Sequence, residues 1–139
     1  MIAIQPTADL LTSSEFTYNN MRSYYEHYGV DWELKQIHEQ ISSLDNWDIL
    51  VDGEVVGAIR LAFDEEGCYL RDLQVAEQFQ NKGIGAQAIK EVETLALKAG
   101  CQQLRLRVFK ISPAYNLYVR VGFVVDKEED RFYYLSKKL

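Results

Sequence analysis

The sequence predicts an α/β (α+β) fold in which a mixed, mostly antiparallel central sheet of about six or seven strands is flanked by about four helices. Three consecutive strands joined by tight turns form an antiparallel meander in the middle of the chain. A long amphipathic helix follows, and the strand after it returns to the sheet in parallel. No Pro- or Ser-rich linker and no internal repeat interrupts the 139 residues, so we expect one domain over 1–139.

The N-terminal segment predicts a short strand and a long helix. The strand covers residues 2–5 and is ended by Pro6, which cannot donate to a sheet ladder. The run Thr12-Ser13-Ser14-Glu15 has the pattern of a capping box, in which Thr12 begins the helix and the Glu side chain caps in return. The helix is expected to continue to about Tyr28, where Gly29 stops it.

A second helix and the strand meander come next. Asp31 is expected to cap this helix, whose apolar positions have the three-four-three spacing of one helical face: Leu34, Ile37, Ile41 and Leu44. Asp52-Gly53 is a strong two-residue hairpin signal, and residues 64–67 form a second turn. The strands that these turns join are expected over residues 47–51, 54–63 and 68–75.

The C-terminal half alternates helices and strands. A Gly-rich segment leads into a helix that runs to Ala99 and is stopped by Gly100; its sheet-facing positions are Gly85, Ala88, Ile89, Val92, Leu95, Ala96 and Ala99. Pro113 then opens a short helix in the first-turn position that suits it, and Gly122 closes this helix. The remaining strands are expected over residues 103–108, 123–126 and 131–136, the first of them parallel to the strand that begins at Cys68.

Composition excludes several classes of protein. The net charge of −6 disfavours a nucleic-acid binder, because a phosphate backbone would be repelled. No apolar run approaches the roughly 18 residues that a membrane span needs, and no secretory signal opens the chain. We therefore expect a cytoplasmic protein with no nucleic-acid or membrane partner. Cys68 and Cys101 are expected to be reduced, and the two His and two Cys have no metal-ligand spacing, so no metal is expected.

The segment Gln80-Asn81-Lys82-Gly83-Ile84-Gly85 has the makings of a phosphate site. Free backbone N–H groups and the positive end of the helix dipole meet at a helix N-terminus. Gly83 and Gly85 would let phosphate oxygens approach the backbone closely, and Gln80 and Lys82 would add side-chain donors. Two such glycines also occur where they only permit close helix–sheet packing, so both interpretations stay open. The P-loop and dinucleotide-binding patterns are not met.

The short helix after Pro113 presents a second candidate. Ala114, Leu117, Tyr118 and Val121 share one face of it. The ordinary interpretation of Tyr118, one of nine Tyr, is a packed aromatic side chain with its hydroxyl bonded nearby. The small residue Ala114, one turn before Tyr118, and the Gly122-Phe123 pair that ends the helix favour a functional role for Tyr118.

These two motifs together resemble the GNAT superfamily of N-acyltransferases. The pyrophosphate motif of that family, Gln/Arg-x-x-Gly-x-Gly/Ala, is matched by Gln80, Gly83 and Gly85, and the apolar-x-Val strand before it by Leu73-Gln74-Val75. The later family pattern is matched by Pro113-Ala114, Leu117-Tyr118 and Gly122-Phe123, with Ser112 in place of an Asn. The resemblance covers residues 68–123 well, whereas the N-terminal helices match only in placement, as the variable substrate-side elements.

The resemblance implies an acetyl-CoA-dependent N-acetyltransferase that needs no metal. Acetyl-CoA would lie between two parallel strands that splay apart, one ending at Val75 and the other near Val108. Its pantetheine would pair with the backbone of Leu73, Gln74 and Val75, like an added strand. Its pyrophosphate would sit on the N–H groups of residues 81–86. The implied donor-binding residues are Leu73, Gln74, Val75, Gln80, Asn81, Lys82, Gly83, Ile84, Gly85, Ala86, Ser112 and Ala114. Ser112 can cap its helix in place of the Asn.

The implied reaction is direct attack of an amine on the thioester in a ternary complex. Tyr118 is the hypothetical general acid, which protonates the leaving thiolate, and Asp72 the candidate general base. Strand alternation places Asp72 on the same face as Leu70 and Gln74, opposite Leu73. The alternative interpretation of Asp72 is a surface or structural carboxylate. A covalent route through either Cys is disfavoured, because neither Cys has a His nearby in sequence.

The first helix and Trp32 are rich in aromatic residues, and two interpretations remain. Phe16, Met21, Tyr24 and Tyr28 have the spacing of a core face, which we favour, but some of the Tyr side chains and Trp32 would also suit a pocket for a cationic amine. The acceptor is expected to be a small-molecule or protein amine. Homodimers are common among the proteins that this chain resembles. The alternative functions are a non-catalytic CoA-binding sensor and a pure interaction module.

Overall fold

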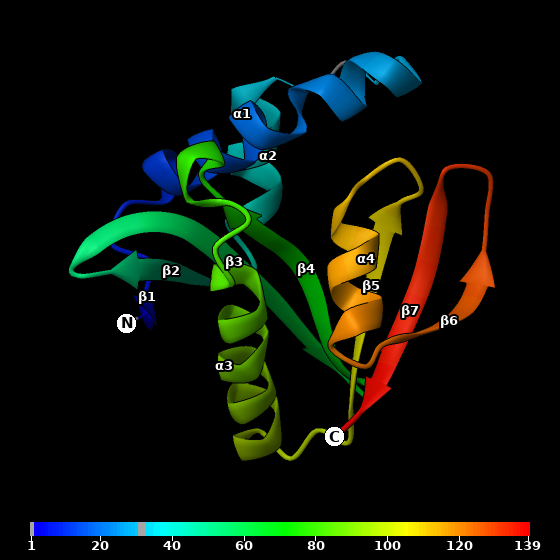
Figure 1. Ribbon diagram of the computed structural model, residues 1–139. Helices are drawn as coiled ribbons and strands as arrows, with labels where there is room; N and C mark the ends of the chain where they lie inside the picture. The colour runs from blue at the N-terminus through cyan, green and yellow to red at the C-terminus, as the bar shows by residue number, and fades with distance from the viewer. Residues whose placement is uncertain (1, 31–32) are drawn as a thin grey trace.

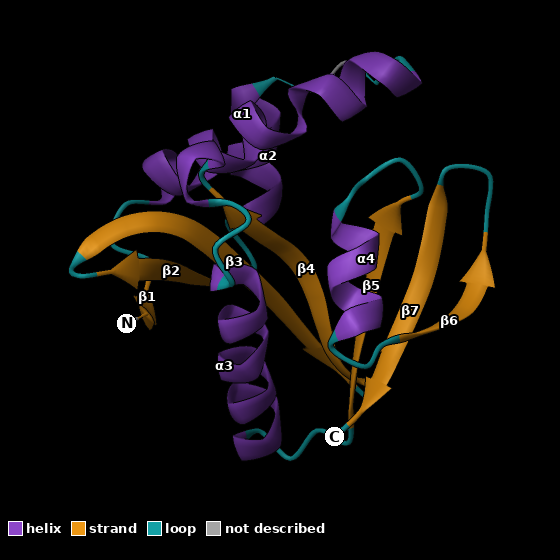
Figure 2. Ribbon diagram, in the orientation of Figure 1, coloured by secondary structure: helices purple, strands orange, loops and turns teal. Residues whose placement is uncertain are grey.

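A computed structural model describes residues 2–30 and 33–139. Within them, one seven-stranded sheet has the order β1-β2-β3-β4-β5-β7-β6. Figures 1 and 2 show α3 and α4 next to one another across one face of this sheet, with α1 and α2 over its upper end. The elements are β1 (Ile2–Pro6), α1 (Leu10–Tyr28), α2 (Leu34–Ile41), β2 (Asp45–Val51), β3 (Glu54–Asp64), β4 (Gly67–Val75), a 3-10 turn (Glu77–Phe79), α3 (Ile84–Lys98), β5 (Gln103–Phe109), α4 (Ala114–Arg120), β6 (Val124–Glu128) and β7 (Phe132–Lys138). The predicted fold class is confirmed.

Helix α1 begins one turn earlier than predicted. The Asp9 carboxylate accepts hydrogen bonds from the backbone N–H groups of Leu11 and Thr12, so Asp9 is the N-cap and the predicted capping box at Thr12 is wrong. The Thr12 hydroxyl donates to the same carboxylate at 2.8 Å, which places Thr12 in the first turn. The predicted stop at Gly29 is confirmed, since this residue has a left-handed φ of 67°.

The start of α2 is only partly described. The predicted cap at Asp31 lies outside the described residues, and the N-cap of α2 is Glu33, which forms a reciprocal capping box with Gln36. Ile37 and Ile41 are buried, as the apolar spacing predicted. Leu44 follows the end of the helix and is half-buried.

The sheet contains the predicted antiparallel meander and the predicted parallel pair. Strands β2 and β3 are joined through Asp52 and Gly53, both with positive φ, as a tight hairpin requires. Strands β4 and β5 are parallel but pair only at Cys68 with Leu104 and at Tyr69 with Arg105. Beyond those two pairs the strands diverge (Figure 1), so the carboxyl half of β4 has β3 on one side and an open edge on the other.

The hydrophobic core lies between the sheet and the helices α3 and α4. Five of the buried core residues come from α3, and their spacing is that of one helical face: Ile84, Ala88, Ile89, Val92 and Ala96. Leu95 packs on this cluster, whereas Ala99 caps the helix and is exposed, contrary to the prediction. This packing holds the N-terminus of α3 against the open edge of β4.

The opposite face of the sheet is packed by polar residues of α1. The residues that α1 buries are Ser13, Ser14 and Thr17, and two of them, Ser13 and Thr17, accept hydrogen bonds from the fully buried Arg60 side chain. The favoured core face of Phe16, Met21, Tyr24 and Tyr28 is therefore wrong, because each of these four is only half-buried. A buried guanidinium needs hydrogen-bond acceptors around it, and a face of small hydroxyl residues supplies them.

Three further observations concern membrane-crossing helices, metal ligands and the two cysteines. No helix in residues 2–30 and 33–139 is long and apolar enough to cross a membrane. The same residues contain no cluster of three or more His, Cys, Asp or Glu side chains that would hold a metal ion. Cys68 and Cys101 are unpaired thiols, as predicted.

Candidate functional site

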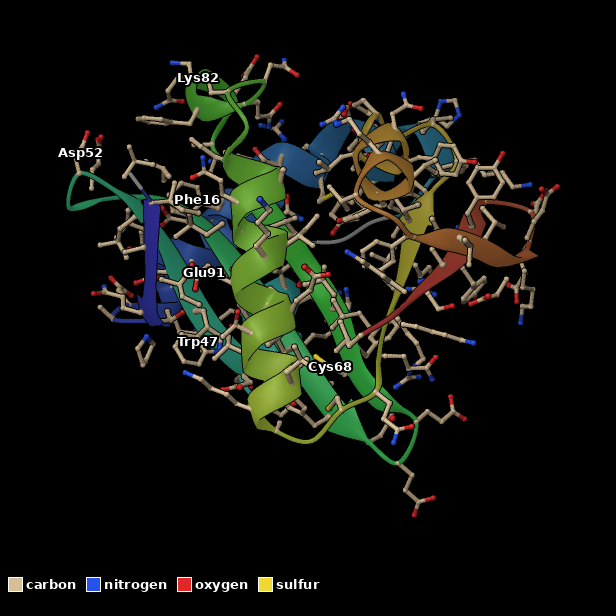
Figure 3. The ribbon with its side chains drawn as sticks, turned by 60° about the horizontal axis from the view of Figure 1, so that its bottom comes forward. Phe16, Trp47, Asp52, Cys68, Lys82 and Glu91 are labelled. Atoms are coloured by element: carbon tan, nitrogen blue, oxygen red, sulfur yellow. The ribbon has the colours of Figure 1, made fainter. Side chains whose placement is uncertain are left out.

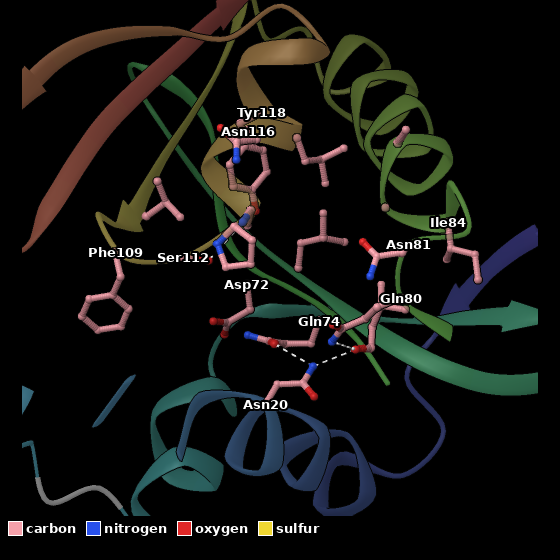
Figure 4. Close-up of a pocket in the computed structure, with 18 of the residues that line it drawn as sticks. Asn20, Asp72, Gln74, Gln80, Asn81, Ile84, Phe109, Ser112, Asn116 and Tyr118 are labelled. Atoms are coloured by element: carbon pink, nitrogen blue, oxygen red, sulfur yellow. Dashed lines mark hydrogen bonds between the residues drawn. The ribbon is translucent and has the colours of Figure 1, made fainter. Parts of the chain in front are cut away.

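A cavity of about 490 Å³ opens where β4 and β5 diverge. It is bounded by β4, the loop before α3, the first turns of α3 and α4, the end of β5 and one side of α1. Figure 4 shows Tyr118 and Asn116 on the α4 side, with Asp72 and Gln74 on the β4 side facing them. Of the fourteen residues that the sequence singled out, thirteen line this one cavity: Asp72, Leu73, Gln74, Val75, Gln80, Asn81, Gly83, Ile84, Gly85, Ala86, Ser112, Ala114 and Tyr118.

Lys82 is the one that does not line the cavity. Its ammonium lies 5.6 Å from the centroid of the Phe79 ring, and Figure 3 shows Lys82 at the outer tip of the loop before α3.

The N-terminus of α3 is open toward the cavity. Gly83 is its N-cap with φ of 80°, and Asn81 also has a positive φ, so the loop turns sharply before the helix. No side chain within the described residues caps this end, which leaves the first backbone N–H groups of the helix available to an anion. A Cβ on Gly83 would meet nothing within 4 Å, whereas one on Gly85 would lie 2.9 Å from Leu117 Cδ2. Gly83 therefore serves the left-handed turn before the helix, and Gly85 serves the close packing of α3 against α4.

Two side-chain amides meet at the carbonyl of Val75, where β4 ends. Asn20 Nδ2 donates to this carbonyl at 2.8 Å, and Gln80 Nε2 donates to it at 2.9 Å. Asn20 also donates to Gln74 Oε1 at 3.1 Å, as the dashed lines of Figure 4 show. These bonds tie α1 and the Gly-rich loop to the end of β4. Asn20 belongs to the site although the sequence analysis did not select it.

A β-bulge at Arg71 changes the face on which Asp72 lies. Arg60 of β3 pairs with Asp72, but the next residue, Leu61, pairs with Leu70, so Arg71 is the extra residue. Leu70 and Leu61 face the core under α3, while Asp72 and Arg60 face α1. The prediction that Asp72 shares a face with Leu70 is therefore wrong. The sequence shows the bulge in its apolar spacing. Cys68 and Leu70 are two residues apart, as in a regular strand, whereas Leu70 and Leu73 are three apart.

The Asp72 carboxylate is nearly buried and lies between two guanidinium groups. Its side chain is 10% exposed, with Arg60 Nη1 3.3 Å from Oδ2 and Arg71 Nη1 3.4 Å from Oδ1. Burial raises the pKa of Asp72 above its ordinary value, and the two arginines act in the opposite direction. A carboxylate with a raised pKa at the wall of a cavity suits proton transfer.

Tyr118 points from α4 into the same cavity. Its side chain is 6% exposed and its ring meets the edge of Phe123 at 5.6 Å. Burial raises the pKa of the Tyr118 hydroxyl, and the negative charge of Asp72 raises it further. The hydroxyl is therefore protonated at neutral pH and able to donate. Ser112 Oγ accepts from the Ala114 N–H at 3.2 Å, but the N-cap of α4 is Pro113, so the prediction that Ser112 caps this helix is wrong by one residue.

An aromatic wall stands between α1 and β5 at the mouth of the cavity. The ring of Phe109 stacks with Tyr24 at 5.8 Å, with Tyr28 at 5.0 Å and with Phe132 at 4.6 Å. Tyr24, Phe109 and Met21 line the cavity, so the pocket interpretation fits these α1 residues better than the core interpretation. Trp32, which the pocket interpretation also named, lies outside the described residues.

Several lining residues were missed or not selected by the sequence analysis: Asn20, Arg71, Phe79, Val108, Phe109, Asn116, Leu117 and Arg120. Each lies within eight residues of a selected residue or on α1, but the sequence gives no sign of which side chains turn inward. Cys68 does not line the cavity, and burial raises the pKa of its thiol to about 12. It is therefore a poor nucleophile.

Comparison with known families gives a match over most of the chain. The family model described as the acetyltransferase (GNAT) family matches residues 9–123. Among curated proteins, the thialysine N-epsilon-acetyltransferase of Bos taurus is 42% identical over 55 residues. That alignment spans 39% of this chain and only 32% of the bovine protein.

Solved structures share the whole fold at low sequence identity. The PaiA N-acetyltransferase from Thermoplasma acidophilum, in complex with coenzyme A, has a TM-score of 0.75 at 19% identity, and the match covers 100% of this chain and 99% of that one. A GNAT family acetyltransferase from Elizabethkingia anophelis with acetyl-CoA bound has a TM-score of 0.70 at 22% identity, with 99% and 98% covered. At these identities the likeness concerns the fold.

Proposed function

The chain belongs to the GNAT family of acetyltransferases, and from that premise we propose that it transfers the acetyl group of acetyl-CoA to a primary amine. One observation carries the proposal: a single cavity joins an open helix N-terminus, an open strand edge, a buried Tyr hydroxyl and a buried carboxylate. Anion binding, thioester placement and both proton transfers need those four features together.

The donor occupies the cavity with its pyrophosphate at the N-terminus of α3. The N–H groups of residues 81–86 suit the phosphate oxygens, because the helix dipole and the missing Gly83 side chain both favour an anion there. The pantetheine arm lies along the open edge of β4, and its amides pair with the backbone of residues 73–75. Coenzyme A and acetyl-CoA are bound by two proteins of this fold, which supports the choice of donor.

The acetyl group moves by direct attack. The ammonium form of the acceptor gives one proton to Asp72, and the neutral nitrogen then attacks the carbonyl carbon of the thioester. A C–N bond forms, the C–S bond breaks with its electron pair on sulfur, and Tyr118 protonates that sulfur. The nitrogen gives its second proton to water as the amide forms. Exchange with water restores both side chains, so one proton is released per turnover.

The acceptor enters from the α1 side of the sheet, where Asp72 and the aromatic wall lie. An ammonium group is attracted by the Asp72 carboxylate, and Tyr24 and Phe109 border the same side of the cavity. A curated relative is named for acetylating an amine of thialysine, which supports an amine as the acceptor class. The alignment covers only 32% of that relative, so thialysine itself is not carried over to this chain.

Calorimetric titration with acetyl-CoA tests the donor site. Binding at micromolar strength, about −8 kcal/mol, is expected for the natural chain. Gly83→Asn and Gly83→Asp form a matched pair, because both side chains tolerate a left-handed backbone and differ in charge. The Asn variant is expected to bind and the Asp variant to lose binding, since a carboxylate there repels the pyrophosphate. Equal binding of the two variants would refute the phosphate placement.

Release of the CoA thiol with a panel of amines then tests catalysis. Turnover with any primary amine supports the proposal. Saturable donor binding without turnover on any amine would identify a non-catalytic CoA-binding module instead. No binding at millimolar donor would reject the donor site itself.

A further inference from the structure

The α1 side of the cavity carries a positive charge that no described lining residue compensates. Asp72 is the only carboxylate that lines this cavity, or the small hollow between α1 and α2 behind it, among the residues that the structure describes. Two guanidinium groups contact it, from Arg60 and Arg71. One negative and two positive charges leave an excess of one positive charge at a nearly buried place, where water screens it poorly.

The two arginines differ in how their N–H groups are used. Arg60 donates to Asn46 Oδ1 through Nε and to Asp72 and Thr17 through Nη1. Its Nη2 donates twice to Ser13, once to the carbonyl and once to the hydroxyl. All five donors of Arg60 are therefore engaged within the protein, and Arg60 is a structural cation.

Arg71 is the cation that remains available. Its hydrogen bond to Asp72 is long, at 3.4 Å, and its side chain is 33% exposed. As the bulged residue of β4, Arg71 lines both the main cavity and the hollow between α1 and α2. That hollow is formed by residues of α1 and α2, so Arg71 stands on the acceptor side, away from the phosphate site at α3. Tyr25 beside it does not supply the missing negative charge, because burial raises the pKa of its hydroxyl to about 12.

We propose that the acceptor is an amine with a carboxylate next to its amino group, a free amino acid, whose carboxylate is bound by Arg71. The inference rests on the proposed function and narrows its acceptor class. Asp72 and Arg71 are in contact, so an ammonium on the first and a carboxylate on the second must lie close together in the ligand. An amino acid has that arrangement, and a guanidinium binds a carboxylate through two parallel hydrogen bonds. Tyr24 and Phe109 then border the space for the amino-acid side chain.

Matched acceptors test the carboxylate. Phenylalanine, phenylalaninamide and phenethylamine share an aromatic side chain and a primary amine, and only the first has a carboxylate. The natural chain is expected to acetylate phenylalanine with a kcat/KM roughly 10- to 100-fold above the other two, the range of a charged hydrogen-bonded contact. Leucine and leucinamide repeat the comparison without the ring. All rates are compared at equal concentrations of the ammonium form, because that form binds at Asp72 and the carboxamide lowers the pKa of the amine beside it.

Variants assign the preference to Arg71. Arg71→Gln is expected to lower the ratio of kcat/KM for phenylalanine to kcat/KM for phenethylamine to about one, mainly through a higher KM for the acid. Arg71→Lys keeps the charge and is expected to restore part of the preference. Arg22→Gln is the control, because Arg22 is an exposed cation of α1 that stacks on Tyr18 and does not line the cavity. It is expected to leave the preference unchanged.

Two outcomes overturn the inference while the proposed function stands. One is equal or better turnover of phenethylamine and the amides by the natural chain. The other is an equal effect of Arg71→Gln on acids and amides, which would make Arg71 only a partner of Asp72. A binding readout needs no turnover: N-acetylphenylalanine is expected to bind the natural chain in a calorimeter in the presence of CoA, and to bind Arg71→Gln roughly 10- to 100-fold more weakly. Its amide is expected to bind both equally, and equal binding of the acid to both proteins would reject the carboxylate site.

Discussion

Arg60 Nη1 lies 3.3 Å from Asp72 Oδ2, directly across the β3–β4 pair and one residue from the β-bulge at Arg71. The same guanidinium bonds to Ser13 and Thr17 of α1. One buried cation therefore fixes both the position of the candidate base and the docking of the helix that closes the acceptor side. The bulge is what turns Asp72 toward that cation.

Arg60→Met is expected to destabilise the protein by about 3–5 kcal/mol, because it leaves buried partners without their donor. Arg60 is fully buried, and its loss strands the hydroxyls of Ser13 and Thr17 as well as the Asp72 carboxylate. The free energy of unfolding in urea measures this directly. Lys127→Gln is the control, since Lys127 and Glu129 form an exposed pair and their loss is expected to cost less than about 1 kcal/mol. Similar losses in both variants would show that Arg60 does not organise this face.

The fold was predictable because its elements repeat simple patterns. The spacing of Ala88, Ile89 and Val92 predicted the buried face of α3, and Asp52-Gly53 predicted the hairpin. Both predictions use local properties of the sequence, namely apolar periodicity and the preference of certain residues for positive φ. The parallel return of β5 followed from the crossover through a helix. Thirteen of the fourteen residues singled out from the motifs line one cavity, because a glycine-rich helix start after a strand has a recognisable sequence; their roles stay predictions.

What could not be predicted depends on contacts between distant residues. The packed face of α1 is polar, so an apolar pattern pointed to Tyr24 and Tyr28 instead of Ser13 and Thr17. The polar residues of this face are explained by the burial of Arg60, which lies more than forty residues away in the sequence. The three-residue spacing of Leu70 and Leu73 indicates the bulge at Arg71. The prediction for Asp72 used strict two-residue alternation along β4 and therefore placed its side chain on the wrong face.

Tyr118→Phe is expected to lower kcat by about 100-fold or more, in the range of general-acid catalysis, with the affinity for acetyl-CoA nearly unchanged. The change removes one hydroxyl from a buried ring and leaves its contact with Phe123 in place. Steady-state kinetics and calorimetry with the same protein separate the two effects. Tyr115→Phe is the matched control, because Tyr115 lies on the same helix, stacks on Tyr133 and does not line the cavity. Unchanged turnover in Tyr118→Phe would exclude the acid role.

In the pH profile of kcat/KM, the fall in rate at low pH that is due to protonation of the enzyme is expected to disappear in Asp72→Asn. A base acts only when deprotonated, so the rate of the natural chain falls as the pH drops through the pKa of Asp72, which burial raises. The limb due to the acceptor amine is common to both proteins and serves as the reference. At neutral pH the variant is expected to be about 100-fold slower.

Asp64→Asn provides the comparison for Asp72. Asp64 lies at the β3–β4 turn and pairs with Arg105, far along the strands from the cavity, and its carboxylate is more than half exposed. The pH profile of kcat/KM of Asp64→Asn is expected to match that of the natural chain. If Asp72→Asn retains the full enzyme limb, the carboxylate is structural and another group takes the proton.

Gly57→Ala tests whether the β3–β4 contact positions the donor-binding edge. A Cβ on Gly57 would lie 2.1 Å from the Gln74 carbonyl oxygen, a backbone atom that cannot move aside alone. The strand end at residues 73–75 must therefore shift, and we expect a loss of about 1–3 kcal/mol in stability together with weaker acetyl-CoA binding. Gly85→Ala meets only the end of the Leu117 side chain, at 2.9 Å, so it is expected to cost less in stability. Thermal unfolding and calorimetry of the two variants give the comparison, and a Gly57→Ala protein that binds acetyl-CoA normally would show that the edge of β4 does not hold the donor.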